Sequence, residues 1–156
     1  PKASSEEFDQ NLQAELLPIG SWEVLQNGND VAILAVGPLT YLALEAAEEL
    51  KKLDISCEVV NCRFIKPMDE NYLEFMSEKF SSVLTIEEGV RSGGFGEGVL
   101  SWLSSNNYKG NSSIISLPDK FVEHGPRDLL LEKWGINKEE IIKTVTSFKS
   151  SLKTEF

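Results

Sequence analysis

One segment constrains the fold of this sequence more than any other. Residues 83–86, Val-Leu-Thr-Ile, are apolar except for Thr85, the carboxylates of Glu87 and Glu88 follow them, and residues 89–96 form a glycine-rich loop. Such a stretch predicts a buried strand. In an open α/β sheet, ligands and neighbouring domains lie in the crevice beyond the carboxyl ends of the strands. The segment therefore indicates where this domain contacts another molecule or domain.

Strand and helix patterns alternate along most of the 156 residues. Residues 31–36 are continuously apolar, which is typical of a strand covered on both faces, and apolar residues at helical spacing follow in 39–50. This alternation predicts a three-layer αβα domain with a mostly parallel five-stranded sheet and one antiparallel strand. The expected strands are 22–26, 31–36, 56–61, 83–87 and 113–117, and the expected helices are 39–50, 70–80, 95–103, 127–134 and 138–148.

The first strand is expected to be the antiparallel one. Residues 27–30, Asn-Gly-Asn-Asp, form a turn signal between the strands 22–26 and 31–36. Because a connection this short permits only an antiparallel partner, we predict that these two strands form a hairpin. Residues 1–17 are polar and predict a linker or arm from a preceding domain, with one domain over 18–156. The first residue is Pro1 and not Met, so we expect a piece of a longer chain.

Charge and composition exclude several classes of function. A net charge of −10 argues against a nucleic-acid surface and against docking on an anionic membrane. The sequence has no apolar run near the roughly 20 residues of a membrane helix. Cys57 lies on the expected strand 56–61 and Cys62 at its end, five residues further on, so the two should point to opposite faces and remain unpaired. Two free buried thiols indicate a reducing cytoplasm or an organelle stroma.

The glycine-rich loop fits no nucleotide-binding pattern. The dinucleotide fingerprint started at Gly94 would place its last glycine at Val99, and no lysine follows to make a phosphate loop. We favour glycines that supply positive φ and allow close packing of the next helix over a phosphate site. Glu87 and Glu88 should point to opposite faces of their strand, so they do not form an acid/base pair. One is expected to cap the next helix or to pair with Arg91, and the other to face a neighbouring domain.

His124 is the only histidine and the best titratable candidate near neutral pH. No serine or cysteine is placed beside it as a nucleophile, and the alternative is a loop histidine that hydrogen-bonds the backbone near Pro126. Arg127 at an expected helix start is unfavourable for the helix dipole, so a carboxylate should hold it. The sequence thus indicates no catalytic, cofactor-binding or metal-ligating residues of its own.

Several motifs nevertheless occur together in a recognisable order. The chain resembles the C-terminal domain of transketolase-type thiamine diphosphate enzymes over about residues 16–148, and within them the 1-deoxy-D-xylulose-5-phosphate synthase family. The motifs are Leu-Pro-Ile-Gly at 17–20, Arg-Phe-Ile-Lys-Pro-Met-Asp at 63–69, Ile-Glu-Glu-Gly at 86–89, Gly-Gly-Phe-Gly at 93–96 and Pro-Asp-Lys-Phe-Val-Glu-His-Gly at 118–125.

The resemblance implies a role within a larger enzyme. That enzyme condenses pyruvate with glyceraldehyde 3-phosphate and releases CO2, as a cytoplasmic or plastid homodimer. Its N-terminal and pyrimidine-binding domains hold thiamine diphosphate and Mg, so this chain alone should be inactive and should act as a structural and dimer-contact domain. Two alternatives remain: the docking domain of a 2-oxo acid dehydrogenase E1 β subunit or of a transketolase, and an independent ligand-binding or regulatory module.

The resemblance also gives candidates for the interface or the approach to the active site. We expect an apolar patch near Phe95, Phe121 and Val122, where the chain would meet its missing domains. The full set of candidates is Glu87, Glu88, Arg91, Gly93, Gly94, Phe95, Gly96, Phe121 and His124.

Overall fold

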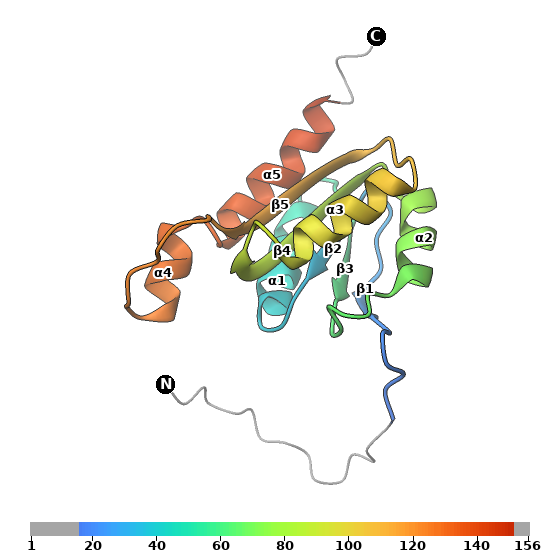
Figure 1. The fold of residues 1–156 in the computed structure, drawn as a ribbon. Helices are drawn as coiled ribbons and strands as arrows, with labels where there is room; N and C mark the ends of the chain where they lie inside the picture. The colour runs from blue at the N-terminus through green and yellow to red at the C-terminus, as the bar shows by residue number, and fades with distance from the viewer. Residues whose placement is uncertain (1–15, 152–156) are drawn as a thin grey trace, which may run out of the picture.

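The computed structural model describes residues 16–151, which form one five-stranded sheet covered by helices on both faces (Figure 1). The strand order is β1-β3-β2-β4-β5; β1 runs antiparallel to β3, and all other neighbours are parallel. This confirms the predicted αβα class. The elements are β1 (Glu23–Gln26), β2 (Val31–Ala35), α1 (Leu39–Lys51), β3 (Cys57–Asn61), α2 (Glu70–Lys79), β4 (Ser82–Val90), α3 (Phe95–Ser105), β5 (Asn111–Leu117), α4 (Arg127–Lys133) and α5 (Lys138–Ser151).

Two separate apolar clusters fill the space between the three layers. Helices α1 and α5 pack on one face of the sheet, and α2 and α3 pack on the other. All five residues of the central strand β2 are buried, with Ile33 in the first cluster and Leu34 in the second. Cys57 and Cys62 also lie in opposite clusters, and both are free thiols, as the sequence predicted.

The predicted hairpin is wrong, because β3 lies between β1 and β2. The connection of residues 27–30 does not fold back on β1 but crosses the beginning of β3. Its backbone is fastened there, since the nitrogens of Asn29 and Asp30 both donate to the carbonyl of Ser56, at 3.1 and 2.8 Å. A Cβ on Gly28 would lie 2.1 Å from the carbonyl carbon of Cys57, so only glycine permits this crossing.

Side chains cap the N-termini of α2 and α5. The Asp69 carboxylate accepts from the backbone nitrogen of Tyr72 at 3.0 Å and caps α2, and it also accepts from the nitrogen of Trp22 at 2.8 Å. Asn137 caps α5 through the backbone nitrogen of Glu140, at 2.9 Å. Among residues 16–151, no helix has the length and hydrophobicity needed to cross a bilayer.

The four parallel strands all end at one side of the sheet, which we call the carboxyl end of the sheet. From β2 the chain continues to β3 on one side, and β4 lies on the other side of β2. The carboxyl ends of β2 and β4 therefore form the switch point where doubly wound sheets place their ligands or neighbours. The loops at this position are residues 36–38 and the glycine-rich loop.

Candidate functional site

The side chain of Glu87, a residue of β4, reaches the N-terminus of α3. Its Oε2 accepts from the backbone nitrogen of Phe95 at 2.9 Å, and its Oε1 accepts from the nitrogen of Gly96 at 2.8 Å. The side chain is buried, with Glu87 only 5% exposed. Helix N-termini attract anions because their first N–H groups have no intrahelical partner. Here the chain's own carboxylate fills that position, which confirms capping over pairing with Arg91.

The glycines of the loop serve backbone geometry and close packing. Gly93 has a φ of +72°, the left-handed region. Gly94 is in an extended conformation, and a Cβ there would lie 2.3 Å from the carbonyl oxygen of Val90. A Cβ on Gly96 would lie 2.5 Å from Oγ1 of Thr85. The loop is therefore folded tightly on β4, as the interpretation without a phosphate site predicted.

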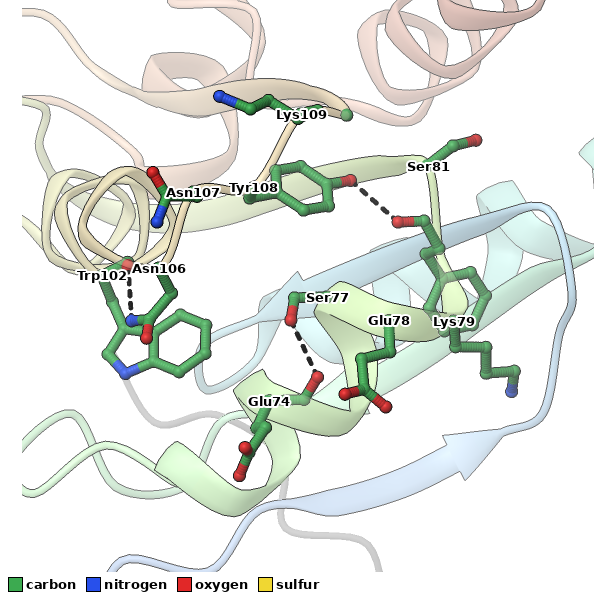
Figure 2. Close-up of a pocket in the computed structure, with 12 residues that line it drawn as sticks. Glu74, Ser77, Glu78, Lys79, Ser81, Trp102, Asn106, Asn107, Tyr108 and Lys109 are labelled. Atoms are coloured by element: carbon green, nitrogen blue, oxygen red, sulfur yellow. Dashed lines mark hydrogen bonds between the residues drawn. The ribbon is translucent and has the colours of Figure 1, made fainter.

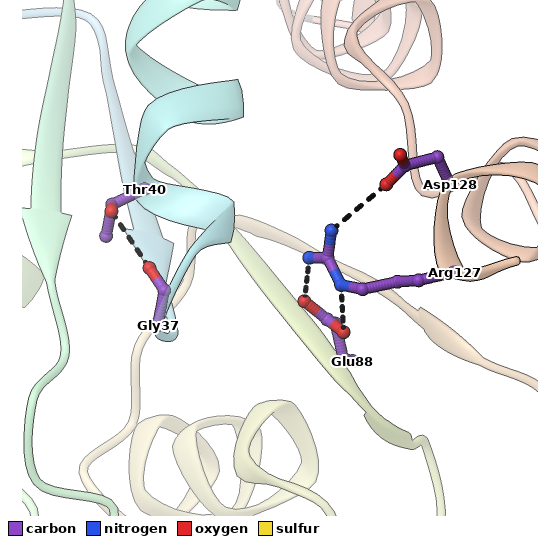
Figure 3. A network of polar contacts seen from close by, with 5 residues as sticks. All are labelled: Gly37, Thr40, Glu88, Arg127 and Asp128. Atoms are coloured by element: carbon purple, nitrogen blue, oxygen red, sulfur yellow. Dashed lines mark hydrogen bonds and ion pairs between the residues drawn. The ribbon is translucent and has the colours of Figure 1, made fainter. Parts of the chain in front are cut away.

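Glu88 forms a two-pronged ion pair with Arg127 (Figure 3). Nε of Arg127 lies 3.0 Å from Oε2 of Glu88, and Nη2 bonds to Oε1, while Nη1 lies 3.3 Å from Asp128. The hydrogen bond to Glu88 raises the pKa of Arg127 further. The expected carboxylate partner of Arg127 is thus Glu88, which keeps 35% of its side chain exposed. The pair fastens the start of α4 to the end of β4.

The remaining candidates do not converge on Glu87. Arg91 is exposed and lines a cleft of about 480 Å3 beside the end of β5, together with Glu97 and Trp134. His124 is exposed in the loop 118–126, and within the described part of the chain it has no hydrogen-bond partner, near Pro126 or elsewhere. The glycine-rich loop is therefore folded around the Glu87 carboxylate, but the side chains of Arg91 and His124 make no contact with that carboxylate.

The expected apolar patch is only partly present. Phe95 is 3% exposed, and its ring packs edge-on to Trp22 with the ring centroids 5.7 Å apart, so its inclusion in a surface patch was wrong. Phe95 is buried because it lies at the start of α3 and packs in the apolar cluster between the sheet and helices α2 and α3. Phe121 is fully exposed, whereas Val122 is half-buried.

Other exposed apolar side chains lie at the carboxyl end of the sheet. They lie before β1, on the first turn of α1, after β3, at the end of β4, after β5 and in α4. The sequence analysis missed most of them, although each lies next to a strand end or a helix start at this end. They are Leu16, Leu17, Ile19, Tyr41, Ile65, Val90, Phe121 and Leu129; elsewhere the large exposed apolar residues are Val24, Leu25, Leu53 and Phe75.

A cleft lies at the opposite end of the sheet, between the C-terminal ends of α2 and α3 (Figure 2). It measures about 700 Å3. Two of its polar groups are used within the domain: the Tyr108 hydroxyl donates to the Phe80 carbonyl at 3.0 Å, and the Ser77 hydroxyl donates to the Glu74 carbonyl at 2.8 Å.

The donors at the carboxyl end of the sheet do not fit a metal or diphosphate site. Glu87 is engaged by two backbone nitrogens, and Glu88 by a guanidinium group. Over the range that the structure describes, no three His, Cys, Asp or Glu side chains are grouped so that they could hold a metal ion. We therefore derive no chemical step through a metal or a cofactor in this chain.

The fold and this site define a doubly wound α/β domain with one antiparallel edge strand, in which an internal glutamate closes the helix terminus at the switch point. The family model described as "Transketolase, C-terminal domain" matches residues 20–141. The chain belongs to the transketolase C-terminal domain family.

Individual relatives give the same result. The chain is 44% identical over 141 residues to 1-deoxy-D-xylulose-5-phosphate synthases of Bacillus cereus (strain AH187) and Bacillus anthracis (strain A0248). Each match covers 88% of this chain and 22% of the relative, so the chain spans about a fifth of their length. Among solved structures, it resembles a "split gene transketolase, inactive beta4 tetramer" with a TM-score of 0.78 and 33% identity, over 92% of this chain and 46% of that one.

Proposed function

We propose that this chain serves as the C-terminal domain of a thiamine diphosphate-dependent synthase that makes 1-deoxy-D-xylulose 5-phosphate from pyruvate and glyceraldehyde 3-phosphate with release of CO2. The observation that supports it most is 44% identity to such synthases over 88% of the chain. In this proposal the preceding domains supply thiamine diphosphate, Mg and the catalytic groups. The domain supplies contacts to them and is inactive alone.

The geometry supports a contact role over a ligand-binding role. The position where an anionic ligand could bind at α3 is filled by Glu87. The carboxyl end of the sheet exposes apolar side chains from several elements, among them Ile65, Val90 and Phe121. Such surfaces are typical of protein interfaces. We therefore assign the carboxyl end of the sheet to the contact with the preceding domains.

A domain exchange tests the proposal. The matched region of the Bacillus cereus synthase is replaced by residues 16–151 of this chain, and formation of 1-deoxy-D-xylulose 5-phosphate is measured. We expect the chimera to retain activity, the synthase truncated before this region to lose it, and the chain alone to show none. A folded but inactive chimera, or turnover by the chain alone, would contradict the proposal.

A second candidate is a domain of a transketolase-type subunit encoded separately from its partner. The similarity to the split-gene transketolase structure, with a TM-score of 0.78, favours it. In that case the chain would support transfer of a two-carbon unit between sugar phosphates. Activity of a transketolase chimera, combined with inactivity of the synthase chimera, would favour this candidate.

A further inference from the structure

A small pocket lies at the amino end of the sheet, where β2 and β4 begin, on the face that α1 and α5 cover. It measures about 240 Å3. Pockets for drug-sized ligands measure roughly 300–1,000 Å3, so this one suits a smaller molecule. One wall is apolar and buried, and it consists of Val31, Ile55, Val145 and Phe148. The pocket can therefore take a short aliphatic group.

Ser82 presents an unused hydrogen-bonding group to this pocket. It is the first residue of β4, and because side chains at alternate positions share a face, it lies on the same face as Leu84 and Ile86, beneath α1 and α5. Only 1% of Ser82 is exposed, yet its hydroxyl has no hydrogen-bond partner among residues 16–151. A buried hydroxyl without a partner is unfavourable, so a ligand that bonds to Ser82 removes this cost.

Two residues of opposite charge line the same pocket without pairing with each other. Oδ2 of Asp30 accepts from the backbone nitrogen of Ser56 at 2.6 Å, and Oδ1 has no partner in the described part of the chain. The ammonium of Lys149 donates to the Asp54 carbonyl at 2.7 Å, which leaves further N–H groups for another acceptor. Neither Asp30 nor Lys149 forms an ion pair within residues 16–151, so both charges are available to a ligand.

We propose that this pocket binds a small aliphatic α-amino acid. The ammonium group of the ligand pairs with Asp30, its carboxylate bonds to Lys149 and to the Ser82 hydroxyl, and its side chain lies on the apolar wall. A ligand with a single charge makes only one of these two ion pairs, whereas a zwitterion makes both. Lys79 also lines the pocket, but Glu58 already holds its ammonium at 2.7 Å, so Lys149 is the cation that the carboxylate selects.

This inference does not depend on the proposed function, because the pocket and the carboxyl end of the sheet lie at opposite ends of the strands. Isothermal titration calorimetry of the purified 156-residue chain with L-leucine tests it. We expect saturable binding of L-leucine. We also expect binding weaker by about tenfold or more for 4-methylpentanoate, which lacks the ammonium group, and for 3-methylbutylamine, which lacks the carboxylate. No saturable binding of L-leucine, or equally tight binding of either analogue, would overturn the inference.

Substitutions in the pocket locate the ligand. Lys149→Met removes an exposed charge and should weaken L-leucine binding by about tenfold or more, whereas Lys143→Met, at another exposed position of α5, should bind like the parent chain. Asp30→Asn keeps an oxygen for the Ser56 nitrogen, so it should weaken binding of L-leucine but not of 4-methylpentanoate. Ser82→Ala should weaken binding of both. Unchanged L-leucine binding by the Lys149→Met and Asp30→Asn variants would place the ligand elsewhere and overturn the inference, whether or not the synthase chimera is active.

Discussion

The carboxylate of Glu87 accepts a hydrogen bond of 2.9 Å from the backbone nitrogen of Phe95. This contact joins the end of a central strand to the start of α3 across the glycine-rich loop. The glycine-rich loop resembles a ligand-binding loop, but this contact gives it a structural role. Because Glu87 is buried and bonds to two N–H groups, its loss should affect folding rather than chemistry.

Glu87→Ala should lower the free energy of unfolding by about 2–3 kcal/mol, since hydrogen bonds to a charged group are lost and two buried N–H groups lose their partner. Urea unfolding followed by circular dichroism measures this. Glu45→Ala, at an exposed position of α1, is the matched control and should change stability by less than about 0.5 kcal/mol. Equal stabilities of the two variants would refute the structural role of Glu87.

Gly94→Val should destabilise the domain more than Gly93→Ala. The sequence alone suggests that positive φ is the reason, but Gly94 is extended and Gly93 is the residue with positive φ. A side chain at Gly94 meets the Val90 carbonyl at 2.3 Å and cannot be accommodated. At Gly93 no atom lies within 4 Å, so only the backbone cost of about 1–2 kcal/mol applies. Thermal unfolding of both variants gives the order, and the reverse order would contradict this explanation.

Arg127→Ala should release α4 without unfolding the domain. The Arg127–Glu88 pair is half-exposed, so its removal should cost at most about 1 kcal/mol of global stability. No residue of α4 is fully buried, so the helix depends on such contacts at its ends. We expect faster cleavage by proteinase K within residues 118–126. Lys143→Ala, which removes an exposed pair with Glu140 on α5, should cleave like the parent chain; equal rates for all three would disprove the anchoring role.

Stability should fall at alkaline pH. Burial raises the pKa of Cys57 to about 12 from an ordinary value near 9, with a contribution from Asp30, and burial raises the pKa of Tyr108 to about 12. The pKa of Cys62 is also raised, mainly by burial. The unfolded chain therefore loses these protons at lower pH than the folded chain, so the stabilisation is complete below about pH 9 and decreases between pH 9 and 12. Urea midpoints across this range should fall, and Cys57→Ala should reduce the slope; midpoints constant up to pH 12 would contradict the burial of these groups.

Local patterns predicted most of the fold correctly, whereas strand order was not accessible from them. The apolar run of β2 identifies a central strand because burial on both faces requires it. The Asn-Gly-Asn-Asp segment led to β2 as the predicted neighbour of β1, but the neighbour is β3. The same four residues suit either a hairpin or a connection that crosses β3, so the sequence does not distinguish the two. The close approach at Gly28 that decides between them is a tertiary contact.

The site was predictable to a similar degree. A cap on α3 by one of Glu87 and Glu88 was foreseeable from their position between a strand and a helix start, but the sequence did not say which of the two it is, and the structure shows Glu87. The need of Arg127 for a carboxylate also follows from the sequence, but its partner Glu88 is 39 residues away, and no local spacing specifies it. Phe95 is buried because its ring packs on Trp22, which lies far away in the sequence. Local sequence therefore could not show that Phe95 is buried while Phe121 is exposed.

The central claim is that the carboxyl end of the sheet contacts the preceding domains of a synthase. The most direct measurement is the activity of the Bacillus cereus chimera with Phe121→Asp, compared with Leu53→Asp. Both side chains are exposed in this domain, but Leu53 lies at the opposite end of the sheet. We predict that Phe121→Asp abolishes activity while the melting temperature of the isolated domain stays unchanged, and that Leu53→Asp leaves both unchanged. Full activity of the Phe121→Asp chimera would contradict the claim.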